Sequence, residues 1–164
     1  MKTEQLQIRV SSKDKANIRK RARAANMDMS EWVLAALFQP VTREFQTLCT
    51  EIAKQGQSPN RFCAFAALSD FLQRLDSDEL LQAVQDLPDA KLDEFSFNYV
   101  AAMVELACYR KKIKPAAWLQ DAEGLSEPYF GSPLLSLRLY LLTHALVPFK
   151  KRNIFIDSSV GDSL

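Results

Sequence analysis

The chain has 164 residues, of which 48% are apolar, and 21 basic and 20 acidic residues give it a net charge of +1. Its longest apolar stretches, such as residues 64–68 and 139–142, are far shorter than the roughly 20 residues of a membrane-spanning helix, and from the polar N-terminus we expect no signal peptide. Cys49, Cys63 and Cys108 lack CxxC spacing, so we expect buried free thiols in a cytoplasmic protein without a membrane segment.

The first predicted element is a strand. Polar and apolar residues alternate along residues 5–10, so that successive side chains point to opposite faces. Leu6, Ile8 and Val10 share one face, while Gln5, Gln7 and Arg9 share the other. An edge strand with a solvated polar face is the alternative interpretation. A lone strand is unstable in water and no second strand pattern follows it closely, so we expect the pairing strand to come from a second copy of the chain.

Two short helices are predicted after this strand. Ser11 and Asp14 resemble a capping box, and an apolar stripe indicates a helix over residues 12–24. Asn26 is a residue type that tolerates the left-handed conformation at a helix end. Ser30 is predicted to cap a second helix, which Pro40 limits. The order strand, helix, turn, helix thus occupies about 40 residues, and the helix signals favour the paired strand over a simple edge strand.

These elements carry a recognisable motif, composed of Arg9-Val10-Ser11, Ala24-Ala25 and Ser30-Glu31-Trp32-Val33. Residues 4–38 thereby resemble the ribbon-helix-helix DNA-binding domain of the MetJ/Arc superfamily, and more closely its small antitoxins. The resemblance implies a homodimer in which two strands form an antiparallel ribbon that enters the major groove of double-stranded DNA. It also implies that Gln5, Gln7 and Arg9 contact base edges.

The residue types suit these contacts on chemical grounds. Arginine can donate two hydrogen bonds to guanine O6 and N7, and glutamine can pair in a similar way with adenine. The resemblance further implies that the backbone N–H groups of Ser30, Glu31 and Trp32 bind a phosphate at the start of the second helix. Lys13 and Lys15 are additional candidates for phosphate contacts.

Charge is unevenly distributed along the chain. Residues 1–39 contain eight basic and four acidic residues, whereas residues 40–164 contain thirteen basic and sixteen acidic residues. A positive N-terminal part suits binding to phosphates and predicts salt-dependent affinity. Part of this charge, such as Arg19-Lys20-Arg21, is also what the wet side of an amphipathic helix carries.

We expect residues 1–40 to be the DNA-binding and dimerisation domain and residues 41–164 to be a helical partner-binding domain. Apolar periodicity and capping signals predict helices that end at Gly56, begin after Ser58-Pro59, and begin at the Asp76 capping box. Further helices are predicted over residues 89–112 and 133–146. The predicted fold class is mainly α, with a ribbon-helix-helix followed by an all-helical bundle.

Aromatic residues beside prolines mark the C-terminal part as a candidate partner surface. The candidates are Trp118, Tyr129, Phe130, Phe149, Arg152 and Phe155. For Trp118 we favour packing in the core, and for residues 149–156 core and interface stay open. Lys150-Lys151-Arg152 is expected to be a solvated turn before a short extended segment, with contact to an acidic partner or nucleic acid as the alternative. The C-terminal region resembles the C-terminal module of antitoxin-like partner proteins in the spacing of four short segments, residues 115–119, 128–130, 137–142 and 148–156.

Nothing in the sequence favours catalysis. The chain has one histidine, His144, near the end of a predicted helix, and it has no nucleophile, metal-binding or phosphate-loop motif. Asp70, Glu94 and Glu105 lie on predicted helices without an obvious basic partner. We therefore expect no catalytic residues, no metal and no cofactor.

Three functions remain compatible with these patterns. The preferred hypothesis is an antitoxin that binds an operator palindrome, represses its own operon and neutralises a protein toxin through its C-terminal region. The alternatives are a free-standing repressor, with a helical domain for oligomerisation or ligand sensing, and an accessory protein of a plasmid relaxosome.

Overall fold

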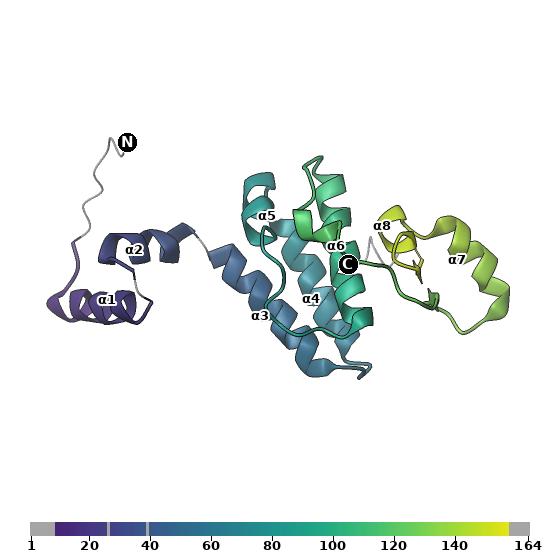
Figure 1. Ribbon diagram of the computed structural model, residues 1–164, viewed down its shortest axis with the longest axis horizontal. Coiled ribbons are helices and arrows are strands. Elements are labelled where there is room, and N and C mark those ends of the chain that lie inside the picture. Colours follow the sequence, from purple (N-terminus) through teal and green to yellow (C-terminus); the bar gives the residue numbers. More distant parts are fainter. Residues whose placement is uncertain (1–8, 26, 39, 158–164) are drawn as a thin grey trace. The chain divides into compact units, whose positions relative to one another are not determined.

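The computed structural model describes residues 9–25, 27–38 and 40–157, and the chain divides into two compact units, residues 1–40 and residues 41–164 (Figure 1). Most of the described residues are helical, which confirms the prediction of a mainly α protein. Within the described ranges, no helix is long and apolar enough to cross a membrane. Gln5, Gln7 and most of the predicted strand lie outside the described residues, so the predicted ribbon stays a prediction.

The first unit contains helices α1 (Ser12–Ala24) and α2 (Met29–Phe38), which pack against each other. The predicted start of α1 is confirmed. The Ser11 hydroxyl accepts a hydrogen bond from the Asp14 N–H at 3.1 Å and donates one to Asp14 Oδ2 at 2.5 Å. The backbone of Ser11 is extended, with φ −67° and ψ 159°, so the chain enters α1 from an extended conformation.

The start of α2 differs from the prediction that Ser30 caps it. The cap is Asp28, whose Oδ1 accepts hydrogen bonds from the N–H groups of Ser30 at 2.6 Å and Glu31 at 2.9 Å. Glu31 completes the arrangement, because its Oε2 accepts the N–H of Asp28 at 3.2 Å. This is a reciprocal capping box, and it moves the cap two residues earlier than predicted, from Ser30 to Asp28, because the Asp28 carboxylate is available as the acceptor. Asn26, the predicted helix stop, lies outside the described residues.

The second unit is built around α6 (Glu94–Arg110), which has nine buried residues. Helices α3 (Pro40–Gln55), α4 (Arg61–Arg74) and α5 (Ser77–Ala83) complete the bundle (Figure 1). Phe65 of α4 stacks on Tyr99 of α6 with 4.2 Å between the ring centroids. The Asp76 capping box and the stop at Gly56, which has φ +52°, are confirmed.

Three of the predicted helices begin later than expected, and the one predicted over residues 133–146 is shortened to a 3₁₀ turn at Leu135–Leu137 and an α-helix at Arg138–His144. Helix α4 starts at Arg61 and not directly after Ser58-Pro59, whose residues form a turn. Helix α6 starts at Glu94 and not near residue 89, because the Asp93 carboxylate caps it by accepting the Ser96 N–H at 2.9 Å. The residues just before Asp93 are irregular, and Ala90 and Leu92 pack against the core. The spacing of these apolar residues fits a helical turn, although in the structure they belong to an irregular segment that packs on the core.

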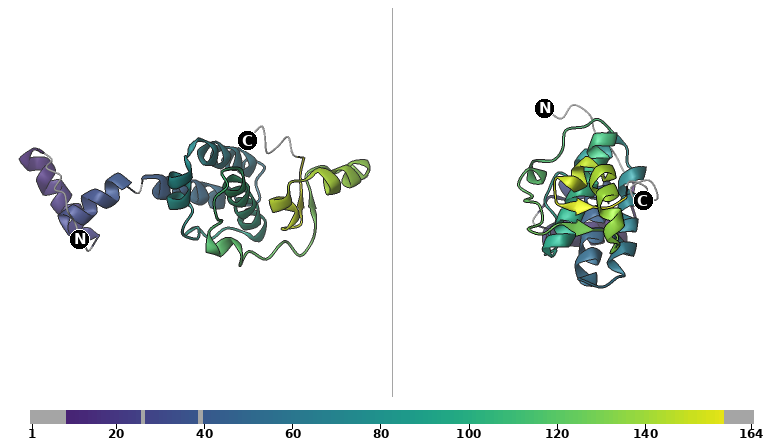
Figure 2. Two further views of the ribbon diagram at one scale, coloured as in Figure 1. Left: turned by 90° about the horizontal axis from the view of Figure 1, so that it is seen from above. Right: turned by 90° about the vertical axis from the view of Figure 1, so that its right-hand side faces the viewer.

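The C-terminal part of the second unit is not all-helical, which corrects the predicted fold class. It contains a 3₁₀ turn η1 (Ala117–Leu119), strand β1 (Tyr129–Phe130), a 3₁₀ turn η2 (Leu135–Leu137), helices α7 (Arg138–His144) and α8 (Val147–Lys150), and strand β2 (Ile154–Phe155). The two strands pair in parallel, with Tyr129 opposite Ile154, and lie side by side in green and yellow in Figure 2. Such a pair needs a crossover connection, which α7 and α8 supply.

Candidate nucleic-acid interface

Helix α1 has a strongly basic surface. Its six basic residues are all exposed, and none of them forms an ion pair with another described residue. They are Lys13, Lys15, Arg19, Lys20, Arg21 and Arg23. Asp14 is the acid within this helix, and its carboxylate is already bonded to the Ser11 hydroxyl. The charges are therefore available to an anionic partner such as the phosphate backbone of DNA.

Arg9 and Val10 precede α1 in the described part of the chain. Both are exposed, and neither belongs to a regular element in the structure. Val10 is 47% exposed although the strand prediction assigns it to a buried face. A single chain thus leaves this apolar side chain uncovered, as expected if the covering strand comes from a second copy. The base contacts predicted for Gln5, Gln7 and Arg9 stay predictions.

The predicted phosphate site at the start of α2 is occupied by the protein itself. The N–H groups of Ser30 and Glu31 donate to the Asp28 carboxylate, and the N–H of Trp32 donates to the Asp28 carbonyl oxygen at 2.9 Å. A phosphate at this place has to displace the side chain of Asp28, which carries the same sign of charge. Contacts of the Ser30 and Glu31 N–H groups with DNA therefore require the capping box to open, and the Trp32 N–H is used by a hydrogen bond of the helix itself.

The first unit has little core of its own among the described side chains. Among the side chains that the structure describes in these helices, those of residues 12–24 and 29–34, Ala22 is buried, and the larger apolar residues Ile18, Trp32 and Val33 are partly exposed. Units of about 40 residues rarely bury enough surface to be stable alone, and oligomerisation is a common remedy. The partly exposed Ile18, Trp32 and Val33 therefore offer apolar surface on which a second copy can pack.

The candidate partner residues of the second unit fall into two groups. Trp118, Phe149 and Arg152 are 8%, 1% and 2% exposed, so these three side chains belong to the core and do not form a partner surface in this structure. The core interpretation of Trp118 is confirmed, since its Nε1 donates to the Val84 carbonyl oxygen at 2.9 Å. The other three candidates, Tyr129, Phe130 and Phe155, are partly exposed on β1 and β2, and their role in binding a partner stays a prediction.

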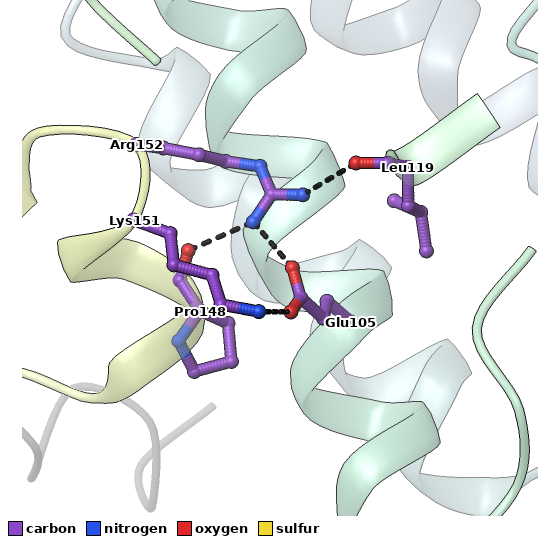
Figure 3. A network of polar contacts seen from close by, with 5 residues as sticks. All are labelled: Glu105, Leu119, Pro148, Lys151 and Arg152. Atoms are coloured by element: carbon purple, nitrogen blue, oxygen red, sulfur yellow. Dashed lines mark hydrogen bonds and ion pairs between the residues drawn. The ribbon is translucent and has the colours of Figure 1, made fainter. Parts of the chain in front are cut away.

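The prediction of a solvated turn at the basic cluster Lys150-Lys151-Arg152 is right for Lys151, which is exposed in a turn, and the predicted short extended segment follows as β2. It is wrong for Arg152, whose side chain is buried. Arg152 donates to Glu105 Oε2 at 2.6 Å and to the carbonyl oxygens of Pro148 and Leu119 (Figure 3). Lys151 donates to Glu105 Oε1 at 2.6 Å. The acidic partner of this cluster is therefore a residue of the same chain. Glu105, predicted to lack a basic partner, has two, and they were missed because more than 40 residues separate them from it in the sequence.

This network lowers the pKa of Glu105. Burial alone raises the pKa of its carboxyl group, but the hydrogen bonds and positive charges of Lys151 and Arg152 outweigh burial and favour the carboxylate. Figure 3 shows that the network joins α6 to the segments that carry Leu119 and Pro148. It therefore holds the C-terminal segment on the bundle.

The remaining chemistry-bearing residues do not converge on a site. His144 ends α7, as predicted, and its Nδ1 lies 3.0 Å from the Tyr140 carbonyl oxygen. Burial raises the pKa of Cys49 to about 12 and that of Cys108 to about 11. Cys63 is exposed, which corrects the expectation that all three thiols are buried. Among the described residues, no group of acidic residues, histidines and cysteines is arranged to hold a metal ion.

A cavity of about 230 Å³ lies between α4, α6 and α8. Leu72, Met103, Leu106 and Phe149 supply an apolar lining, and Arg110 and Lys111 add positive charge. Its volume is below the range of roughly 300–1,000 Å³ that is usual for small-molecule sites. The cavity alone therefore gives little support to a ligand-sensing domain.

Comparison with protein families gives a match in the N-terminal part of the chain. Residues 1–56 match the NikA-like family, described as mobilization protein NikA. Comparison with curated proteins and with solved structures gives no match to the chain. The matched region contains α1, α2 and α3 and thus covers about a third of the chain. This similarity supports a DNA-binding, ribbon-helix-helix type of N-terminal region, and it favours the mobilization alternative over the antitoxin hypothesis.

Proposed function

We propose that this protein is a non-catalytic accessory protein of plasmid mobilization that binds double-stranded DNA at a transfer origin as a homodimer. The match of residues 1–56 to a mobilization protein family carries this proposal. The exposed basic surface of α1 and the partly exposed apolar residues Ile18, Trp32 and Val33 support DNA binding by a paired N-terminal unit. Its place of action is then the cytoplasm, where the DNA is.

Recognition of the DNA sequence is assigned to the segment before α1. Two chains pair residues 5–10 into an antiparallel ribbon, and Gln5, Gln7 and Arg9 of each chain point to base edges in the major groove. Lys13 and Lys15 contact phosphates that flank this groove and set the orientation of the dimer. Because a symmetric dimer presents the same residues twice, the site is expected to be an inverted repeat.

The antitoxin hypothesis is not carried forward. The matched family is one of mobilization proteins, and three of the six residues predicted to bind a toxin are buried in the core of the second unit. A repressor remains distinguishable by the DNA it selects, since it binds its own promoter and not a transfer origin.

The proposal is tested by a mobility-shift assay with two DNA fragments, the transfer origin of the DNA molecule that carries the gene and the promoter of the gene itself. We expect specific binding to the transfer origin. Arg9→Ala should weaken this binding by about 1–3 kcal/mol, the energy of a bidentate base contact, while leaving the dimer intact. Lys114→Ala, an exposed change in the second unit, is the matched control. Specific binding to the promoter alone would replace this proposal by the repressor hypothesis.

A further inference from the structure

Residues 134–147, which include η2 and α7, carry an unusual number of exposed apolar side chains. Seven of the fourteen large hydrophobic residues that are exposed in the described part of the chain lie in this short segment. They are Leu134, Leu135, Leu137, Leu139, Tyr140, Leu142 and Val147, with exposed fractions from 40% to 72%. Scattered single apolar residues are normal on a surface, but a contiguous patch of this kind marks an interaction site.

Helix α7 has few contacts with its own unit. Its one buried residue is Leu141, at 4% exposure, and Figures 1 and 2 show α7 extending away from helices α3 to α6. Leu135, Leu139 and Leu142 follow each other at intervals of four and three residues, so they share one side of the helical segment, which we call the leucine face. A helix that is apolar on nearly all sides is normally buried. The leucine face is therefore incomplete in a single chain.

The charge of this segment limits what can cover it. Residues 131–149 contain no aspartate, glutamate or lysine and a single arginine, Arg138. Its guanidinium carbon lies 4.9 Å from the centroid of the Phe130 ring of the same chain. Charged groups reach the segment at its edge, since Asp157 hydrogen-bonds to Tyr140 and Lys150 Nζ donates to the Thr143 carbonyl oxygen at 2.8 Å. Leu135, Leu139 and Leu142 themselves carry no charge. Two copies can approach each other here without like-charge repulsion, and charged residues are depleted at the centre of protein interfaces in general.

The size of the patch also agrees with a contact between two copies. From their exposed fractions, the seven residues together present on the order of 700 Å² of surface, of which Leu135, Leu139 and Leu142 supply roughly half. A contact that also covers the flanking apolar residues approaches the roughly 800 Å² that each partner contributes to a standard interface. A symmetric contact of two such patches buries the same residues on both sides. A contact between two copies therefore needs no further surface on either copy.

We propose that the leucine face of α7 packs against the same face of a second copy, so that the C-terminal units also join in the dimer. This inference rests on the proposed function, because the N-terminal ribbon holds the second copy close and raises its effective concentration. Leu139 lies near the two-fold axis, with Leu135 and Leu142 on either side. The protein then has two dimer contacts, one at each end of the chain.

The first test changes the leucine face in the full chain. Leu139→Glu with Leu142→Glu should weaken self-association by about tenfold or more, measured by sedimentation equilibrium, because buried leucines are replaced by charges. The matched control is Leu81→Glu with Leu87→Glu, since these leucines are 42% and 51% exposed in the same unit. Equal association constants for both double variants and the unchanged protein would overturn the proposal.

The second test measures contact directly. Leu139→Cys in a Cys63→Ser background should give covalent dimers with a short bis-maleimide, whereas Leu81→Cys in the same background should not. The proposal is overturned if these dimers do not form. It is also overturned if Leu139→Glu with Leu142→Glu leaves self-association unchanged and only abolishes binding to phospholipid vesicles, since the leucine face then contacts lipid. Mobility shifts on the same samples separate the two proposals: DNA binding without crosslinking refutes the α7 contact alone, and crosslinking without DNA binding refutes the DNA-binding function alone.

Discussion

Arg152 is a charged side chain with almost no exposure, and it is stabilised by groups from three places in the second unit. Its two terminal nitrogens donate to Glu105, to the Pro148 carbonyl oxygen and to the Leu119 carbonyl oxygen. A buried charge is tolerated when it is paired and its donors are used, and here both terminal nitrogens are used, while the buried Nε has no hydrogen-bond partner among the described residues. Glu105 supplies the pairing charge and shares it with Lys151, so removing its charge leaves Arg152 without an anionic partner.

Glu105→Gln should therefore reduce the free energy of unfolding by roughly 3 kcal/mol at neutral pH, measured by urea denaturation. The pKa of Glu105 is lowered in the folded chain, so its stabilisation is present above the ordinary value of 4.5 and is lost as the pH falls from there through the lowered pKa. The difference between the variant and the unchanged protein should shrink over that interval. Glu51→Gln is the control, since Glu51 pairs with Lys54 on the surface and its loss should cost less than about 1 kcal/mol.

At the scale of elements, carboxylates decide where several helices begin. Asp28, Asp76 and Asp93 cap α2, α5 and α6, and the Asp76 cap was evident from the sequence because Glu79 stands at the expected spacing. Asp28 has the same spacing to Glu31, but Ser30 is part of the family motif and a common cap residue, so the cap was assigned to Ser30 and not to Asp28. The start of α6 was missed for another reason, since Ala90 and Leu92 continue the apolar pattern into an irregular segment.

The corrected cap makes a prediction for α2. Asp28→Ala should lower the stability of the first unit by about 1 kcal/mol, because it removes the acceptor for the N–H groups of Ser30 and Glu31. Ser30→Ala should have a much smaller effect, and Asp28→Ser should retain most of the stability because a hydroxyl also caps helices. Thermal melting followed by circular dichroism measures these changes. A larger loss for Ser30→Ala than for Asp28→Ala would contradict the assigned cap.

At the scale of the whole molecule, the small net charge conceals two parts of opposite sign. The proposed DNA-binding part carries the positive excess, and the exposed basic residues of α1 hold most of it. Binding to DNA that depends on these residues releases counterions, and its affinity falls as salt is added. The second unit is slightly acidic and contributes folding and, in our proposal, a second contact between copies.

Lys13→Ala should weaken binding to all DNA sequences alike. The slope of log affinity against log salt concentration should fall by about 1 for each phosphate contact that is lost. Titrations by fluorescence anisotropy at several salt concentrations measure this slope. Lys114→Ala should leave it unchanged, and an effect of Lys13→Ala confined to one DNA sequence would show that Lys13 reads bases and does not bind phosphate.

The sequence by itself determined what depends on neighbouring residues: the bounds of α1, the Asp76 cap, the stop at Gly56, the mainly helical class and the basic N-terminal part. These follow from spacings of a few residues, which local hydrogen bonds and side-chain periodicity control. Tertiary structure decided which side chains are available. It placed Trp118, Phe149 and Arg152 in the core, paired Glu105 with Lys151 and Arg152, joined β1 to β2 and left the leucine face exposed, because packing between distant segments has no local pattern in the chain.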